Sequence, residues 1–155
     1  HNRPPIRAVK KLGAEYPKHP RIGVRGIIID KKRILLIKRR AEPNREFWSI
    51  PGGNIKLGER LTDAVEREVE EETGLKVRAI KIEEISEMIK RDRDGRVKYH
   101  YIIIDYRTRI LEGRLKAASD AQEAGWFTSK KAEELKISNI TKRLLKKLTK
   151  KGEIE

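Results

Sequence analysis

The feature that most constrains this chain is a segment whose helical pattern places acidic side chains on its apolar face. At roughly 100° per residue, residues 61–73 form a helix with one apolar stripe. The apolar positions of this stripe are Leu61, Ala64, Val65 and Val69. Glu68 and Glu72 are one turn apart and project into the stripe, and Glu71 lies at its edge. Gly74 favours an end to the helix at this point. We therefore expect three carboxylates to face the protein.

Carboxylates in such a position need a cation, because desolvating and crowding unpaired acids is costly. Arg67 could serve one of them. A cluster of oxygen ligands at turn spacing is also the usual arrangement for Mg²⁺ or Mn²⁺. The glycines at 52 and 53 would let the backbone approach a ligand closely. The alternative is a solvated acidic helix that pairs with the many lysines of the chain.

Length and composition indicate one folded domain. A chain of 155 residues can bury one sizeable core. Its charged fraction is 40%, but the apolar residues come in compact runs, which is typical of packed strands rather than of a disordered chain. The Pro-rich and basic residues 1–20 are interpreted as an N-terminal arm, and residues 21–150 as the single domain.

The formal charge of +14 predicts an anionic partner, either nucleic acid or a small phosphorylated metabolite. Cysteine is absent, which excludes disulfides and thiolate metal sites. No segment resembles a signal peptide, and no apolar run approaches the roughly 20 residues of a membrane span. We expect a cytoplasmic protein without a membrane partner.

The remaining patterns alternate between strands and helices. Residues 21–29 and 33–38 are predicted to form a hairpin, and residues 76–90 and 96–110 a longer one around a turn at residues 92–95. Short strands are expected at 47–50 and 125–127, and helices at 129–135 and 140–148. Apolar residues occur on both faces of the strand 96–110, so we expect an α/β fold with helices on both sides of a sheet.

The acidic helix lies within a longer pattern of fixed spacing. Its defined positions are Gly53, Glu59, Arg67, Glu68, Val69, Glu71, Glu72, Gly74 and Leu75. This pattern resembles the Nudix box at every defined position. The order of strands before and after it, including a Trp-Phe strand near Trp126, follows the same family from about residue 21 to 135. The resemblance implies an α/β/α sandwich around a central mixed β-sheet.

The resemblance also implies roles for individual residues. The metal ligands for Mg²⁺ (or Mn²⁺) would be Gly52 through its carbonyl, Glu68, Glu71 and Glu72. Arg67 would orient Glu68, and Glu59 would brace the loop before the helix. A further acid before Trp126 serves as ligand or base in some members, which makes Asp120 the first candidate and Glu123 the second. Glu71, Glu68, Arg67 and Asp120 are thus the predicted catalytic residues, and the identity of the general base stays open.

The substrate is less constrained than the chemistry. The second hairpin and the segment after it look most like short Nudix proteins assigned as ADP-ribose pyrophosphatases, which yield AMP and ribose 5-phosphate. However, the proline that marks many of them is missing around Lys90. The alternative enzyme is a pyrophosphohydrolase of oxidised or ordinary nucleoside triphosphates. The candidate substrate contacts are Arg25, Arg39, Arg40 and Arg45 for phosphates, and Trp48 or Tyr101 for a base.

A nucleic-acid-binding module is the alternative from another class, because residues 3–11 and 142–151 are rich in Lys and Arg. These segments contain no recognition motif and no interleaved aromatic residues, so nucleic acid is not the favoured partner. Many Nudix enzymes are homodimers, and residues 1–20 could cross to a second copy; a homodimer is therefore a possible assembly.

Overall fold

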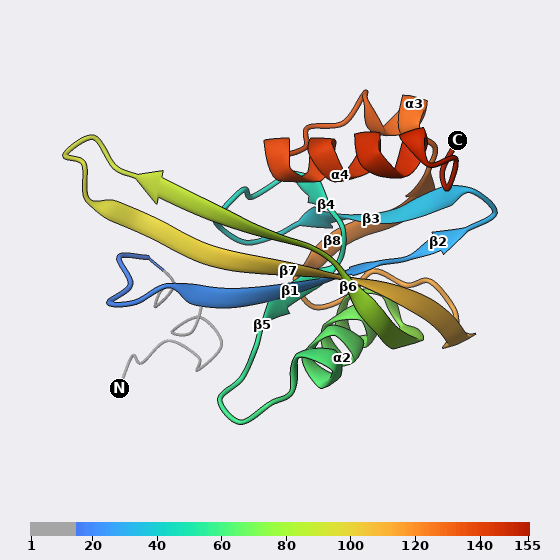
Figure 1. Ribbon diagram of the computed structural model, residues 1–155, viewed down its shortest axis with the longest axis horizontal. Helices are drawn as coiled ribbons and strands as arrows, with labels where there is room; N and C mark the ends of the chain where they lie inside the picture. The colour runs from blue at the N-terminus through green and yellow to red at the C-terminus, as the bar shows by residue number, and fades with distance from the viewer. Residues whose placement is uncertain (1–14) are drawn as a thin grey trace.

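A computed structural model describes residues 15–155 of the chain, and its elements follow the order expected for alternating strands and helices (Figure 1). The strands are β1 (Arg21–Ile27), β2 (Ile29–Asp30), β3 (Arg33–Arg39), β4 (Trp48–Ser49), β5 (Gly52–Asn54), β6 (Leu75–Arg91), β7 (Val97–Gly113) and β8 (Ala121–Phe127). The helices are α2 (Leu61–Thr73), α3 (Ser129–Ala132) and α4 (Asn139–Lys150).

The strands form two four-stranded sheets in the described part of the chain. The first has the order β5-β1-β7-β6, in which β1 and β7 are parallel and the other pairs are antiparallel, so this sheet is mixed. The second contains β2, β3 and β4, with β8 paired to β3. The parallel pair requires a long crossover between β1 and β7, and this crossover contains α2.

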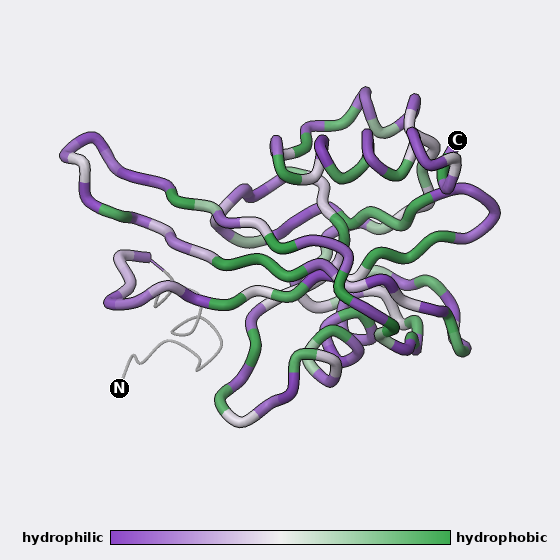
Figure 2. The backbone as a smooth tube through the Cα atoms, in the orientation of Figure 1, coloured by the Kyte–Doolittle hydropathy of each residue, from purple (hydrophilic) through white to green (hydrophobic). Residues whose placement is uncertain are grey.

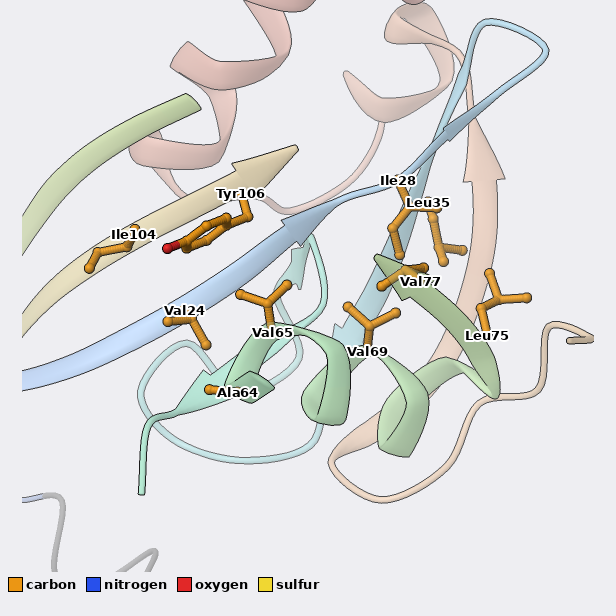
Figure 3. Packing of buried hydrophobic residues seen from close by; sticks show 10 residues of the cluster. All are labelled: Val24, Ile28, Leu35, Ala64, Val65, Val69, Leu75, Val77, Ile104 and Tyr106. Carbon is orange, nitrogen blue, oxygen red and sulfur yellow. The ribbon is translucent and has the colours of Figure 1, made fainter. Parts of the chain in front are cut away.

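Helices lie on opposite sides of the strands, with α2 below them and α3 and α4 above them in Figure 1. One apolar cluster packs α2 against the first sheet through residues such as Val65, Val69 and Val24 (Figure 3). A second cluster joins α3 and α4 to the second sheet, with Leu144 and Leu148 fully buried. Apolar residues therefore gather between the layers, while the hairpin tips are hydrophilic (Figure 2). The predicted α/β/α fold with a mixed sheet is confirmed.

Ion pairs tie α4 and the C-terminal residues to the first sheet. Glu83 on β6 is nearly buried, and its carboxylate contacts the Lys147 ammonium at 2.7 Å and the Arg107 guanidinium. Arg107 on β7 also contacts Glu153, at 2.7 Å. The neighbouring Ile154 is buried in the second apolar cluster. These contacts fix the layer that contains α4 over the sheet that contains β6.

The first predicted hairpin is the main departure from expectation. Residues 29–30 and 33–34 do pair as β2 and β3. However, β1 pairs with β5 and β7 instead of with β3. The chain passes from one sheet to the other at Ile28, which is fully buried. The long hairpin is confirmed; β6 begins and ends one residue beyond the predicted bounds 76–90, and β7 covers Val97–Gly113 where 96–110 was predicted.

The predicted N-terminal arm lies mostly in residues 1–14, outside the described residues. The first described strand begins at Arg21, and the segment before it contacts the long hairpin through a hydrogen bond from the Tyr16 hydroxyl to Asp92. The domain bounds of 21–150 stay a prediction. Within residues 15–155, no helix is long and apolar enough to cross a membrane.

Candidate active site

Helix α2 has the bounds predicted from its pattern, and it places Glu68 and Glu72 inward as expected, whereas Glu71 is exposed. It ends where Gly74 adopts φ 77°, a left-handed conformation that glycine tolerates, and the Gly74 amide donates to the Glu70 carbonyl at 2.9 Å. The exposed fraction is 3% for Glu72 as a residue, 14% for the Glu68 side chain and 44% for the Glu71 side chain. Exposure of the three acids thus increases from Glu72 through Glu68 to Glu71, and Glu71 lies at the solvent-exposed edge.

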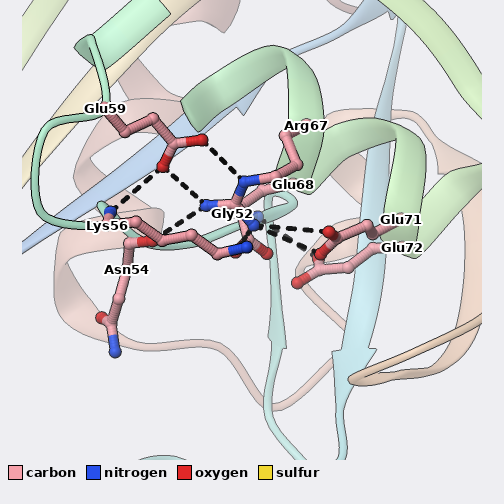
Figure 4. A network of polar contacts seen from close by, with 8 residues as sticks. All are labelled: Gly52, Asn54, Lys56, Glu59, Arg67, Glu68, Glu71 and Glu72. Atoms are coloured by element: carbon pink, nitrogen blue, oxygen red, sulfur yellow. Dashed lines mark hydrogen bonds and ion pairs between the residues drawn. The ribbon is translucent and has the colours of Figure 1, made fainter. Parts of the chain in front are cut away.

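Arg67 is the centre of a polar network around these acids (Figure 4). Its Nε donates to Glu59 at 2.8 Å, and its Nη1 contacts Glu68 at 2.7 Å and Glu71 at 3.3 Å. Its Nη2 donates to Glu59 and to the Asn54 carbonyl. Hydrogen bonds from Arg67 hold the pKa of Glu59 down at about 2, so this carboxylate stays charged. Arg67 therefore joins the loop before α2 to the acids on the helix.

Glu72 is the least compensated of the three acids. Its carboxylate accepts a hydrogen bond of 3.3 Å from the Gly52 amide. Burial raises its pKa well above the usual range, and the charge of Glu68 raises it further. Burial also raises the pKa of Glu68, although Arg67 opposes the shift. A cation beside Glu72 and Glu68 would reverse both shifts, because it would stabilise the charged carboxylates.

The donor atoms near Glu72 fit a hard divalent cation. Carboxylates and the backbone of Gly52 offer oxygen ligands, the type that Mg²⁺ and Mn²⁺ prefer. Between residues 15 and 155, no three acidic or histidine side chains are already gathered around one point. Arg67 holds Glu68 and Glu71 in the ion pairs described above, so a metal would have to draw them away from it.

Gly53 allows the loop before α2 to approach the acids. A Cβ atom placed on it would lie 2.5 Å from the Glu68 carboxylate, closer than real Cβ contacts occur. Gly53 belongs to β5 and pairs with Val24 of β1, so sheet pairing fixes its backbone. The absence of a side chain at this position is therefore a condition for the observed place of Glu68.

These residues line one side of an open cleft with a volume of ≈ 1430 Å³. The acidic side includes Arg67, Glu68, Glu71, Glu72 and Asp120. The lining also includes the strand β4 and residues 137–140 around the start of α4, and α4 lies on the other side of the strands from α2 (Figure 1). The cleft is large enough for a nucleotide with a second group attached, since ligand pockets commonly measure roughly 300–1,000 Å³.

Some of the residues predicted to contact substrate line the cleft, and others lie outside it. Arg39 and Trp48 line the cleft, and the Arg39 Nε donates to the Pro43 carbonyl at 2.9 Å. Arg25 also lines it, but its guanidinium is bound to Asp105, as described below. Arg45 is exposed and is not among the cleft residues. Its role as a phosphate contact stays a prediction.

The two candidate acids before Trp126 differ in position. Asp120 lines the cleft together with the glutamates of α2. Glu123 lies on β8 opposite Lys38, and its carboxylate contacts the Lys38 ammonium at 3.6 Å with most of the side chain exposed. This geometry favours Asp120 over Glu123 as a site residue, and its catalytic role stays a prediction.

Sequence reasoning missed most of the apolar part of the cleft. Met88 of β6 lies opposite Tyr101 of β7, and both line the cleft with Ile103. Tyr101 was a candidate for stacking, but Met88 and Ile103 were not singled out. Alternation along the two strands could have indicated that they share a face, but the pairing of residues 88 and 101 depends on bulges that the sequence pattern does not reveal.

Comparisons with known proteins agree with this geometry. The sequence-family model of the NUDIX domain matches residues 19–148 of the chain. An ADP-ribose pyrophosphatase of Methanocaldococcus jannaschii is 40% identical over 111 residues, covering 70% of this chain and 62% of that protein. An 8-oxo-dGTP diphosphatase of Buchnera aphidicola is 44% identical over 53 residues, or 34% of this chain and 41% of that protein. The crystal structure of a MutT Nudix hydrolase from Burkholderia pseudomallei has a TM-score of 0.70 and 27% identity, covering 83% of this chain and 98% of the other.

Proposed function

Because the chain belongs to the Nudix family, we propose that it hydrolyses a phosphoanhydride bond in a nucleoside diphosphate linked to a second group, and that its substrate is ADP-ribose. The products would be AMP and ribose 5-phosphate. The observation that carries the proposal is that Glu68, Glu71 and Glu72 of one helix all line a cleft large enough for both halves of such a substrate.

The metal-binding residues would be Glu68, Glu71, Glu72 and the Gly52 carbonyl. A bound Mg²⁺ or Mn²⁺ would neutralise the diphosphate and lower the pKa of a water ligand. Arg67 forms ion pairs with Glu68 and Glu71 at 2.7 and 3.3 Å, and it would keep these acids on the cleft side of α2 until a metal binds them. Asp120 lines the same cleft and would be the candidate general base.

The organic groups of the substrate have complementary surfaces in the cleft. Met88, Tyr101 and Ile103 offer an apolar wall against which a base could pack. Arg39 and Lys56 line the cleft as cations for phosphate oxygens. The choice of ADP-ribose is supported by the M. jannaschii relative, whose similarity covers 70% of this chain. The chain spans less than two thirds of the length of that relative. The activity of the whole relative is therefore assigned to this chain only as part of this proposal.

A triphosphate substrate has weaker support. The similarity to the 8-oxo-dGTP diphosphatase covers only 34% of this chain, so it reflects a part of the domain and not the whole cleft. A nucleic-acid-binding role is not favoured, because the basic segments of the sequence contain no recognition motif and no interleaved aromatic residues.

The test is product analysis with Mg²⁺ or Mn²⁺ on ADP-ribose, NADH, diadenosine polyphosphates, nucleoside triphosphates and oxidised dGTP. We expect AMP and ribose 5-phosphate from ADP-ribose, with activity abolished by EDTA and restored by the metal. Glu71→Gln should reduce kcat by roughly 10²-fold or more, since it removes a charged ligand. Glu70→Gln is the matched control, because Glu70 is the exposed neighbour on the same helix. Pyrophosphate released from a triphosphate, with ADP-ribose intact, would overturn the substrate assignment.

A further inference from the structure

Arg25 is surrounded by protein partners although it lies in the cleft wall. Its Nε and Nη2 donate to the two carboxylate oxygens of Asp105, at 2.7 and 2.8 Å. Its Nη1 donates to the hydroxyl oxygens of Thr141 at 2.9 Å and Ser49 at 3.2 Å. Asp105 is 0% exposed and Thr141 is 0% exposed. All three guanidinium nitrogens thus have a protein partner, which leaves Arg25 poorly suited to bind a phosphate.

The partners of Arg25 come from three separate parts of the fold. Asp105 is on β7 of the first sheet, next to Arg25 in the parallel register. Ser49 is on β4 of the second sheet, and Thr141 is in the first turn of α4. A planar guanidinium with several fixed donors can hold three such groups at once, which a lysine ammonium does less well. Arg25 therefore joins both sheets and α4 at one buried point.

This point lies between the two sides of the cleft. On the acidic side, the backbone of Arg25 pairs with Gly52, whose amide donates to Glu72. On the other side, Thr141 accepts a hydrogen bond from the hydroxyl of Ser138, the residue that caps α4 and lines the cleft. The chain of contacts thus runs from the candidate metal ligands through Arg25 to the start of α4.

We propose that Arg25 is a positioning residue that sets the distance between the glutamates of α2 and the α4 side of the cleft. The inference rests on the proposed function, because it assigns the α4 side to the organic part of the substrate. Loosening α4 would weaken substrate binding but leave the reacting phosphates and the glutamates in place. The variant that tests this is Thr141→Val, which keeps the shape of the side chain and removes the hydroxyl that Arg25 binds.

We expect Thr141→Val to raise KM about tenfold and to change kcat by less than about twofold, since hydrogen bonds to charged groups are among the stronger ones. Thr149→Val is the control on the same helix, because its hydroxyl donates to the Leu145 carbonyl away from the cleft. It should leave both constants unchanged. A fall in kcat at constant KM, or an equal effect of the two variants, would overturn the proposal.

A second variant separates positioning from direct contact with substrate. Arg25→Lys keeps a cation beside Asp105 but loses the fixed donors to the two hydroxyls. If Arg25 acts through Thr141, the double variant Arg25→Lys/Thr141→Val should have about the same KM as the single variant that raises KM more. If Arg25 binds phosphate directly, the two increases in KM should multiply in the double variant, and Arg25→Lys alone should lower kcat. Either result would refute a positioning role for Arg25.

The wild-type protein tests the proposed function independently of Arg25. The kinetic comparison uses whichever substrate of the panel the wild type cleaves, so a failure of ADP-ribose alone does not affect it. Hydrogen exchange gives a readout without turnover: the amides of residues 139–143 should exchange several-fold faster in Thr141→Val, and those of α2 at the wild-type rate. Unchanged exchange at the start of α4 would overturn the inference even if no substrate were cleaved.

Discussion

The site depends at the residue scale on how closely backbone and side chains approach one another. Glu68 occupies the space where a side chain on Gly53 would lie, and Arg67 draws the same carboxylate into a contact of 2.7 Å. Gly53 is itself held by its pairing with Val24. Position 53 is therefore sensitive to size even though no side chain there takes part in the chemistry.

Gly53→Ala should reduce activity far more than stability. The added methyl group would displace the Glu68 carboxylate, and a misplacement of about 1 Å at a site can cost roughly 10²-fold in rate. We expect kcat to fall by about that factor while the melting temperature changes by only a few degrees. Gly125→Ala on β8 is the control, because its new Cβ would meet only the Phe127 ring at 3.2 Å. Wild-type turnover by the Gly53 variant would contradict this account.

The elements show where sequence patterns suffice and where they do not. The bounds of α2 were predicted correctly, because one apolar stripe and Gly74 act within the helix itself. The partner of β1 was predicted wrongly, because β1 pairs with β7, whose residues lie about 80 positions away in the sequence. Glu66 is a smaller case: helical periodicity places it opposite the apolar stripe, but its carboxylate accepts a hydrogen bond of 2.9 Å from the Ala79 amide.

The same limit applies to the candidate site. The spacing of the glutamates and Arg67 specifies a local cluster, and the structure brings these residues together as expected. The partners of Arg25 are distant in sequence and lie on three elements, so no local pattern could indicate them. Long-range contacts of this kind decide whether an arginine in a cleft is free for substrate.

Glu83 should stabilise the packing of α4 on the first sheet in a way that depends on pH. Hydrogen bonding to Lys147 lowers the pKa of Glu83 from 4.5 to about 2, and Arg107 acts in the same direction. The stabilisation should thus be complete above about pH 5 and be lost as the pH falls toward 2, because protonation removes the favoured charge. Glu83→Gln should lower the free energy of unfolding at pH 7 by on the order of 2 kcal/mol.

The measurement is denaturant unfolding of both proteins from pH 7 to pH 2. The difference in the free energy of unfolding between wild type and Glu83→Gln should shrink below pH 4.5 and nearly vanish near pH 2. Glu112→Gln is the matched surface control, because Glu112 contacts Lys76 at 3.5 Å with both side chains mostly exposed. Such pairs contribute about 0–1 kcal/mol. A Glu83 effect that does not depend on pH would show that packing, and not charge, is responsible.

At the scale of the whole molecule, the charge of +14 opposes the acidic character of the cleft. The glutamates would repel an anionic substrate locally, but the net field of the protein attracts it from a distance. Much of this positive charge is remote from the chemistry. Exposed cations of α4 such as Lys146 and Lys150 lie outside the cleft, so their contribution can be separated from direct contacts.

We therefore expect kcat/KM for the proposed anionic substrate to fall several-fold between about 50 and 500 mM salt while kcat stays nearly constant, because the Debye length shortens from roughly 14 to 4 Å. Steady-state kinetics over this range give both constants. The double variant Lys146→Gln/Lys150→Gln should begin from a lower kcat/KM and show a shallower salt dependence, with an unchanged kcat. If the variant kept the wild-type salt dependence, the attraction would come from cations inside the cleft, such as Arg39 and Lys56, instead of from the field of the whole surface.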